Sequence, residues 1–385
     1  MAIYLDNAAT ARMSDTAVAE MIRCMRENYG NPSSIHSAGQ RASAALFDAR
    51  ERMASLLGCT PKELTFTSGG SEADNQALLT AARIGVKTAK RHIVSSAFEH
   101  HAVLNTLEKL EKEGFEITLI NVGEDGIVRP EDVERAIRAD TVLVSIMYAN
   151  NEIGTIQEVE RIGGICKDHG VLFHTDAVAA AGHVHIDVKK QNINMLSLSA
   201  HKFGGPKGIG TLYARRGIKP ERLIEGGAQE RGARPGTENL PAICAMAAAF
   251  EYSCRNMDEN AKKEQKLRDA LIIGLSHIPG AHLNGDADKR LPGNVNFSFD
   301  GVEGETLVLL LDGKGICASS GSACTSGSLE PSHVLLAIGR SPDAARASLR
   351  LSIGAENTEE EIEFTVKAVR ECVEYLRGVS REKKY

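Results

Sequence analysis

The sequence contains no tryptophan, and aromatic residues make up only 4% of the chain. It also lacks any apolar run near the ~20 residues that a membrane-spanning helix needs. The N-terminus reaches an acid, Asp6, too soon for a signal peptide. A formal net charge of -6 provides no basic excess of the kind that general nucleic-acid binders carry. We therefore expect a cytoplasmic protein that binds neither nucleic acid nor membrane.

The cysteines lack the spacing of the common structural sites. Eight of them are scattered along 385 residues, and none forms a Cys-x-x-Cys pair. We therefore predict no metal site and no disulfide framework, and expect most of these cysteines to be small buried residues. The Gly-Lys-Ser/Thr ending of a Walker loop and the Gly-x-Gly-x-x-Gly pattern are missing too, which makes a nucleotide-binding module an unfavourable interpretation.

A lysine stands at the end of a short apolar run. Residues 195–198 predict a buried strand, and the glycine-rich residues 203–210 beyond Lys202 predict a turn. An amine held at a buried strand end is desolvated, which lowers its pKa and allows it to form a Schiff base with an aldehyde. Because most lysines are simply solvated, Lys202 alone is weak evidence for catalysis.

Asp176 strengthens this interpretation. It follows the apolar residues 170–173 and so ends another predicted strand, where open parallel sheets collect ligand-binding groups. A buried carboxylate opposite a pyridine nitrogen keeps that ring protonated, as pyridoxal phosphate (PLP) requires. An aspartate that caps a helix is the alternative. Together, Asp176 and Lys202 indicate a PLP site.

Two further strand ends carry polar groups. Gly70 and Ser71 follow the predicted strand 64–67 at a helix start, where backbone N–H groups can approach an anion, although a tight turn would need the same residues. His100 and His101 follow a predicted strand over residues 93–96. Paired histidines can bind metals, but no nearby ligand spacing completes a site.

The alternation of predicted strands and helices indicates an α/β fold with a doubly wound, mainly parallel sheet. Residues 294–299 alternate between polar and apolar, which predicts a half-buried strand in a second, smaller α+β domain. We predict a large cofactor-binding domain over residues 14–255 and a small domain formed by residues 1–13 and 256–385.

Two features of the predicted small domain carry chemistry. Cys324 lies among Ser, Gly and Thr in residues 318–328, which predicts a mobile, exposed loop rather than a buried position. An exposed thiol on such a loop can act as a nucleophile. Arg350 lies in an apolar predicted strand, where a guanidinium needs an anionic partner. That partner is either a substrate carboxylate or a structural salt bridge.

These motifs, from residues 4–10 to residues 350–354, resemble those of cysteine desulfurases of the NifS/IscS type, which are PLP enzymes of fold type I. The resemblance implies that PLP bound to Lys202 removes sulfur from L-cysteine, giving L-alanine and a persulfide on Cys324, as in the longer-loop group. It assigns His100 to stacking on the cofactor ring and to proton transfer. The implied cofactor contacts are Gly70, Ser71, His100, Asn150, Asp176, Ser199, His201, Lys202 and Thr237. The implied substrate contacts are Asn31, Asn150 and Arg350.

The resemblance also implies partners. Thr237 would reach the PLP phosphate of the partner subunit, so a homodimer with shared active sites is expected. The persulfide would pass to an acceptor such as an iron-sulfur scaffold or a tRNA-thiolation protein. For Asn31 and Asn150, the residues alone favour polar turns, and their site roles depend on the resemblance.

One position departs from the family pattern. The family usually reads Asp-Ala-x-Gln after the strand that ends at Asp176, and its glutamine donates to the PLP phenolic oxygen, but here the residue is Ala179. We expect PLP still to bind, with a raised pKa of the lysine-bound cofactor and slower turnover. A selenocysteine lyase or an aminotransferase, neither of which needs Cys324, and a weakly active or non-catalytic sulfur carrier are the alternatives.

Overall fold

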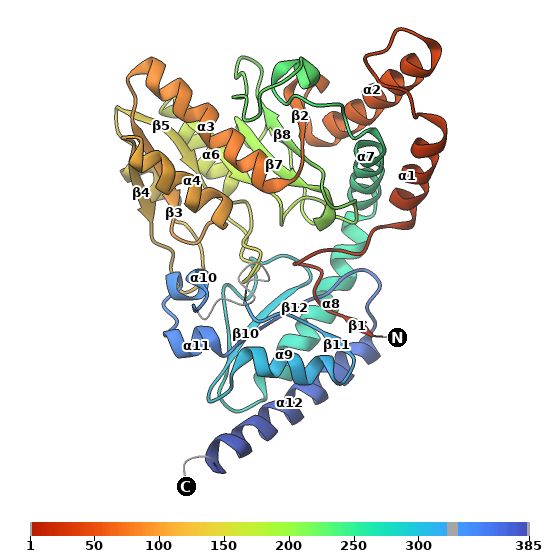
Figure 1. The fold of residues 1–385 in the computed structure, drawn as a ribbon. Helices are drawn as coiled ribbons and strands as arrows, with labels where there is room; N and C mark the ends of the chain where they lie inside the picture. The colour runs from red at the N-terminus through yellow and green to blue at the C-terminus, as the bar shows by residue number, and fades with distance from the viewer. Residues whose placement is uncertain (1, 322–329, 383–385) are drawn as a thin grey trace.

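The computed structural model describes residues 2–321 and 330–382, and it contains one large sheet and two small ones (Figure 1). The large sheet has seven strands in the order β2-β8-β7-β6-β5-β3-β4. They are β2 (Leu64–Thr67), β3 (His92–Ser96), β4 (Glu116–Ile120), β5 (Thr141–Ser145), β6 (Leu172–Asp176), β7 (Met195–Ser199) and β8 (Gly210–Ala214). Strands β7, β6, β5, β3 and β4 pair in parallel, whereas β8 is antiparallel to both of its neighbours. The predicted fold class is confirmed.

Helices cover both faces of this sheet. They are α1 (Asp15–Glu27), α2 (Ser37–Leu57), α3 (Gly70–Thr88), α4 (His101–Lys112), α5 (Pro130–Ala136), α6 (Val159–Asp168) and α7 (Leu240–Arg255). Successive strand residues point to opposite faces, so Leu143 packs in the cluster of α3 and α4 and Val144 in the cluster of α1, α2, α6 and α7. Burial on both faces explains why β5 and β7 read as nearly continuous apolar runs.

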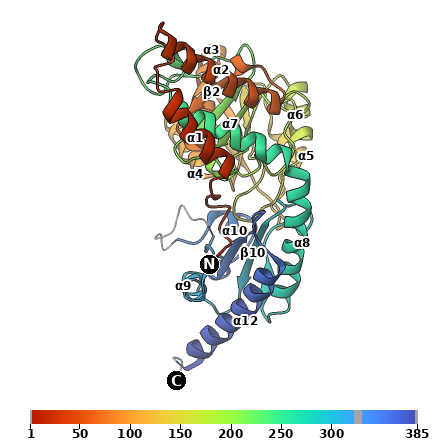
Figure 2. The same ribbon diagram turned by 90° about the vertical axis from the view of Figure 1, so that its right-hand side faces the viewer.

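A second body packs around the small sheets, in the lower half of Figure 1. Its strands are β1 (Ile3–Tyr4), β9 (Ala281–Leu283), β10 (Asn294–Phe299), β11 (Ile316–Cys317) and β12 (Ser348–Ser352). Its helices are α8 (Met257–Ser276), α9 (Gly304–Asp312), α10 (His333–Ala337), α11 (Pro342–Arg346) and α12 (Glu359–Glu382). Strand β10 lies between β12 and β9, and β1 pairs with β11 in parallel. The first strand and the last helix of the chain thus share this body (Figure 2).

Strand β10 differs from the half-buried strand that its alternation predicts, because all six of its residues are buried. The polar face is covered as well: the Asn296 side chain donates to the Glu152 carbonyl at 3.1 Å and accepts from Asn284 at 2.8 Å. Buried polar groups of this kind are tolerated when they are hydrogen-bonded. The polar side of β10 therefore lies against the turn after β5 rather than against water.

The chain passes from the large-sheet part to the small-sheet part between α7, which ends at Arg255, and α8, which begins at Met257. The predicted domain limits at residues 13/14 and 255/256 remain a prediction. Within the two described ranges, every helix is too short or too polar to cross a lipid bilayer.

Candidate active site

Lys202 ends a short 3-10 turn, η2 (Ala200–Lys202), directly after β7. Its Nζ donates to the Ala8 carbonyl and, at 3.0 Å, to the Ala9 carbonyl. The N-terminal segment is held against η2 because the Ala11 amide donates to the His201 carbonyl at 2.8 Å. The amine therefore lies where the N-terminal segment crosses the end of a central strand.

Asp176 is the last residue of β6, the strand beside β7, and it is 5% exposed. Its Oδ1 accepts from the Val178 amide at 2.8 Å. Burial raises the pKa of Asp176, while the charges of His100 and Lys202 act in the opposite direction. A protonated pyridine nitrogen facing this carboxylate would add a further positive charge and favour its ionised form.

Asp74, on α3, is a second buried acid next to Asp176. Burial, and then the Asp176 charge, raise the pKa of Asp74 well above its ordinary value. Its Oδ1 has no hydrogen-bond partner and lies 3.7 Å from His174 Nε2. Asp176 has the cationic neighbours, so of the two acids the pKa of Asp74 is raised more strongly. Asp74 was not predicted as a site residue, because an aspartate within a helix is usually exposed.

The start of α3 forms a cradle beside these strand ends. A Cβ on Gly70 would lie 2.7 Å from Val178 Cγ2 and 3.5 Å from Ser199 Cβ, so glycine is needed for this close approach. The N–H groups of Gly70 and Ser71 open a helix that runs to Thr88, and such helix starts favour anions.

His201 provides an unsatisfied group near this cradle. Its Nδ1 is buried without a hydrogen-bond partner. Burial, with the charges of Lys202 and Lys207, lowers the pKa of His201 to about 4. A buried, unpaired nitrogen on the residue before Lys202 indicates that a ligand completes the site. These features fit a phosphate-bearing cofactor.

His100 caps the N-terminus of α4, the helix that follows β3. Its Nδ1 accepts from the Ala102 amide at 3.1 Å, so Nε2 carries the proton in the neutral ring. The His100 ring centroid lies 6.4 Å from that of His101, and His101 lies 4.5 Å from His333 on α10. Because its charge lowers the pKa of Asp176, His100 lies near the predicted site.

Asn150 is fully buried and is engaged at both ends of its side-chain amide. Nδ2 donates to the Phe98 carbonyl at 3.1 Å, and Oδ1 accepts from the amides of Glu152 at 2.8 Å and Ile153 at 3.1 Å. Asn150 therefore stabilises a turn, which is the interpretation that the residues alone favour. Its side-chain amide has little hydrogen-bonding capacity left for a ligand. The neighbouring Asn151, which sequence reasoning missed, lines the Lys202 pocket. Two adjacent asparagines gave no signal for choosing between them.

The Lys202 pocket lies between elements of the two bodies, and Ala179 is part of its wall. The position that usually carries glutamine in the family thus faces the pocket and offers only a methyl group. The pocket is lined by Asn7, Ala8, Asn151, Ala179, His183, Lys202, Glu264, Leu291, Gly293, Asn294, Ser352 and Ile353.

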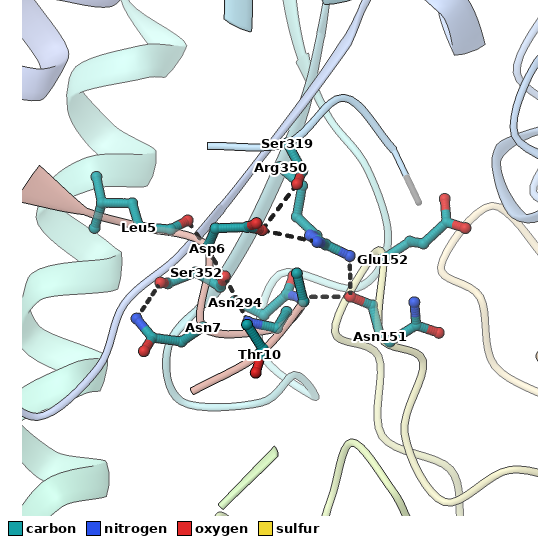
Figure 3. Close-up of polar contacts among 12 residues, drawn as sticks. Leu5, Asp6, Asn7, Thr10, Asn151, Glu152, Asn294, Ser319, Arg350 and Ser352 are labelled. Atoms are coloured by element: carbon teal, nitrogen blue, oxygen red, sulfur yellow. Dashed lines mark hydrogen bonds and ion pairs between the residues drawn. The ribbon is translucent and has the colours of Figure 1, made fainter. Parts of the chain in front are cut away.

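Arg350 lies in β12, 1% exposed, at the edge of the same region (Figure 3). Its Nη2 is 3.0 Å from Asp6 Oδ1, which also accepts from the Ser319 hydroxyl at 2.8 Å. Its Nη1 donates to the Asn151 carbonyl at 3.3 Å, while Nε is buried without a hydrogen-bond partner. The structural salt bridge named as the alternative is present, and Nε remains available to another acceptor.

Asn31 and Thr237 are exposed and do not line the Lys202 pocket. The Asn31 Oδ1 accepts from the Ser33 amide at 2.9 Å, as in a polar turn. A separate cavity of about 360 Å³ brings this turn next to the segment that carries Thr237. Its lining residues are Ser33, Arg50, Ala228, Gln229, Glu230, Arg231 and Glu238.

Cys324 lies outside the described residues. Among the cysteines within them, burial raises the pKa of Cys59 and Cys166 to about 12 and that of Cys254 to about 11. Such thiols are poor nucleophiles at neutral pH. In the described part of the chain, no three His, Cys, Asp or Glu side chains are arranged to hold a metal ion.

Comparison with known proteins adds independent evidence. The aminotransferase class-V family model matches residues 3–364. A cysteine desulfurase IscS from Methanosarcina thermophila is 50% identical over 379 residues, which are 98% of this chain and 94% of that protein. A cysteine desulfurase IscS from Clostridium botulinum is 49% identical over 381 residues, which are 98% of this chain and 96% of that protein.

Solved structures agree. A NifS-like protein superposes with a TM-score of 0.91 at 40% identity, covering 97% of this chain and 100% of its own. The structure of SspA in complex with cysteine has a TM-score of 0.81 at 34% identity, covering 92% of this chain and 100% of its own. The family match spans most of the sequence and the large sheet carries Lys202 and Asp176 at adjacent strand ends, so the chain belongs to the aminotransferase class-V family.

Proposed function

We propose that the protein is a PLP-dependent cysteine desulfurase, which converts L-cysteine to L-alanine and retains the sulfur as a persulfide. The observation that carries the proposal is the convergence of Lys202, Asp176 and the unpartnered His201 nitrogen at neighbouring strand ends, in a chain similar to cysteine desulfurases over nearly its full length. PLP bound there supplies an electron sink for the bond changes at the amino-acid substrate.

The cofactor would be held from several sides. Lys202 would bind it covalently, and Asp176 would pair with its ring nitrogen. His100 would stack on the ring. The groups that would hold the phosphate are Gly70, Ser71, Ser199 and His201. For the contact expected of Asn150 we favour Asn151, because Asn151 lines the Lys202 pocket whereas the Asn150 amide is engaged within its own turn.

The remaining groups would bind substrate and move protons. Arg350 would bind the substrate carboxylate through its unpartnered Nε, with Asn151 beside it. The Lys202 amine, released as substrate binds, would take the proton from Cα. The Cys324 thiolate would attack the substrate sulfur: the S–S bond forms as the Cβ–S bond breaks, and the bonding pair stays on Cβ, which takes up a proton to become the methyl group of L-alanine. His100 Nε2 would transfer protons near the sulfur.

The assembly would be a cytoplasmic homodimer. An exposed cavity apart from the Lys202 pocket is lined by Ser33 and Glu238, which are close in sequence to Asn31 and Thr237, and this supports a role for both residues at the active site of the partner subunit. The Cys324 persulfide would then pass to an acceptor protein such as an iron-sulfur scaffold or a tRNA-thiolation protein.

Mass spectrometry of Cys324 after addition of L-cysteine tests the proposal. A gain of one sulfur atom at Cys324, with release of L-alanine, is expected in the unaltered protein and is lost in Cys324→Ser, while visible absorbance still reports the bound cofactor. Unimpaired alanine and sulfide production by Cys324→Ser would contradict the role of this thiol.

A further inference from the structure

The described residues that flank segment 322–329, Gly321 and Ser332, both lie close to one buried carboxyl group, that of Glu152. A Cβ on Gly321, just before the segment, would lie 3.6 Å from Ser332 Cβ and 3.7 Å from Glu152 Oε2. On the other side, the Ser332 hydroxyl donates to Glu152 Oε2 at 2.6 Å. We call Gly321, Ser332 and Glu152 the neck of the segment. None of these three residues has a role in the proposed chemistry.

Glu152 is 1% exposed and is fixed to the pocket wall (Figure 3). Its amide donates to Asn150 Oδ1 at 2.8 Å, and its carbonyl accepts from Asn296 at 3.1 Å. The preceding residue, Asn151, lines the Lys202 pocket and accepts from Arg350. The Glu152 carboxyl group therefore has a defined position relative to the proposed substrate-binding groups.

The neck is also fixed on the small-sheet side. Ser332 caps α10, since its hydroxyl accepts from the Leu335 amide at 3.2 Å. The next residue, His333, donates from Nε2 to the Glu99 carbonyl at 2.8 Å. On the N-terminal side of the segment, the Ser319 hydroxyl donates a hydrogen bond to Asp6, the ion-pair partner of Arg350. The described residues on both sides of the segment are thus hydrogen-bonded to elements that also form the pocket.

We propose that Glu152 is a positioning residue for sulfur transfer: by accepting the Ser332 hydrogen bond it keeps the residues that follow segment 322–329 beside Gly321, which precedes it, and so sets the place from which Cys324 approaches the substrate. The inference rests on the proposed function. Fixing both ends of a tether restricts the space that its middle can reach, which raises the effective concentration of a group it carries. Burial raises the pKa of Glu152, while the Ser332 hydrogen bond and the charges of Arg350 and the nearby histidines act in the opposite direction.

Single-turnover kinetics of Ser332→Ala test this role. We expect Cys324 persulfide formation to slow by about 10- to 100-fold, because a small displacement of a reacting group can cost that much. The cysteine concentration that half-saturates the visible spectral change at Lys202 should stay as in the unaltered protein. Ser332→Thr, which keeps the hydroxyl, should restore the rate.

Ser341→Ala is the matched control. Ser341 caps the neighbouring short helix α11 by accepting from the Ala344 amide at 3.2 Å, so this change removes a helix cap without touching Glu152. Its persulfide rate should remain close to that of the unaltered protein. Equal rates of persulfide formation in Ser332→Ala and Ser341→Ala would overturn the proposal. The effect of Ser332→Ala would then come only from the loss of a helix cap and not from the loss of the hydrogen bond to Glu152.

Hydrogen exchange gives a readout that does not depend on turnover. Peptides covering residues 316–321 and 330–336 should exchange faster in Ser332→Ala and in Glu152→Gln than in Ser341→Ala. Unchanged exchange rates would show that the Glu152–Ser332 hydrogen bond does not stabilise the neck. If the unaltered protein forms no persulfide at Cys324, the proposed function fails. The exchange comparison still decides whether Glu152 and Ser332 hold the segment.

Discussion

Individual side chains in this protein have chemistry that their neighbours determine. Glu264, on α8, lines the Lys202 pocket although it is 4% exposed, and burial raises its pKa to about 8. The burial of Glu264 could not be predicted from residue type, because a glutamate among the many charged residues of α8 is expected to be exposed to solvent. Ala179, in contrast, was recognisable from the sequence because it departs from the family motif. Its position in the wall of the Lys202 pocket agrees with the expectation that this residue affects the cofactor.

Glu264 makes the stability of the protein depend on pH. A carboxyl group whose folded pKa exceeds its unfolded pKa stabilises the fold fully below the unfolded value, and this contribution is lost as pH rises towards about 8. We expect Glu264→Gln to add about 2–4 kcal/mol to the free energy of unfolding at pH 8.5 but little at pH 5. Urea denaturation of both proteins at the two pH values measures this. A difference that does not grow with pH would contradict it.

Ala179→Gln should restore a donor to the pocket. A hydrogen bond to the phenolic oxygen of the bound cofactor favours its ionised form, so the apparent pKa of the visible absorbance change should fall and turnover should rise. A spectrophotometric pH titration of both proteins gives the comparison. An unchanged midpoint would show that the missing side chain does not affect the cofactor.

At the scale of elements, the sequence predicted best where burial was uniform. The strand at residues 195–198 was predictable because β7 is buried on both faces, whereas β10 was expected to be half exposed and is not. Its polar residues bond to a distant turn, and local periodicity does not report such a contact. Helix α2 begins at Ser37 because the side chain of His36 caps it by accepting from the Gly39 amide. Histidine is not among the preferred capping residues, so no start signal was visible.

Helix α3 illustrates an element whose first residue serves the site. We expect Gly70→Ala to weaken PLP binding by at least about tenfold, because its Cβ would lie 2.7 Å from Val178 and displace the helix start from the proposed phosphate site. Gly164→Ala in α6 is the control: no atom lies within 4 Å of its added Cβ, so it should leave cofactor binding unchanged. Fluorescence titration with PLP measures both affinities. Equal affinities would contradict the proposed cradle.

At the scale of the whole molecule, the pocket depends on contacts between segments far apart in sequence. Arg350 near the C-terminus pairs with Asp6 near the N-terminus, and Lys202 donates to the carbonyls of Ala8 and Ala9. The motifs identified Lys202 and Arg350 as candidate site residues, but they did not predict the ion pair between Arg350 and Asp6. Asn31 and Thr237 lie outside the Lys202 pocket, in the segments whose Ser33 and Glu238 line the second cavity, which supports a site completed by a second copy.

Mixed dimers test this sharing. A Lys202→Ala chain paired with a Thr237→Ala chain should contain one complete site, because Lys202 comes from one chain and Thr237 from the other. Its PLP affinity should equal that of the unaltered protein, whereas the Thr237→Ala homodimer should bind PLP more weakly. If the mixed dimer has no site of normal affinity, Thr237 does not serve the partner subunit.

The covalent bond between Lys202 and PLP is the central feature of the proposed site, and peptide mapping after borohydride reduction of the purified holoenzyme tests for it. We predict a coloured protein in which the reduced pyridoxyl group is found on Lys202, and a Lys202→Ala variant that lacks multiple turnover. A colourless protein, or reduction that leaves Lys202 unmodified, would contradict the account.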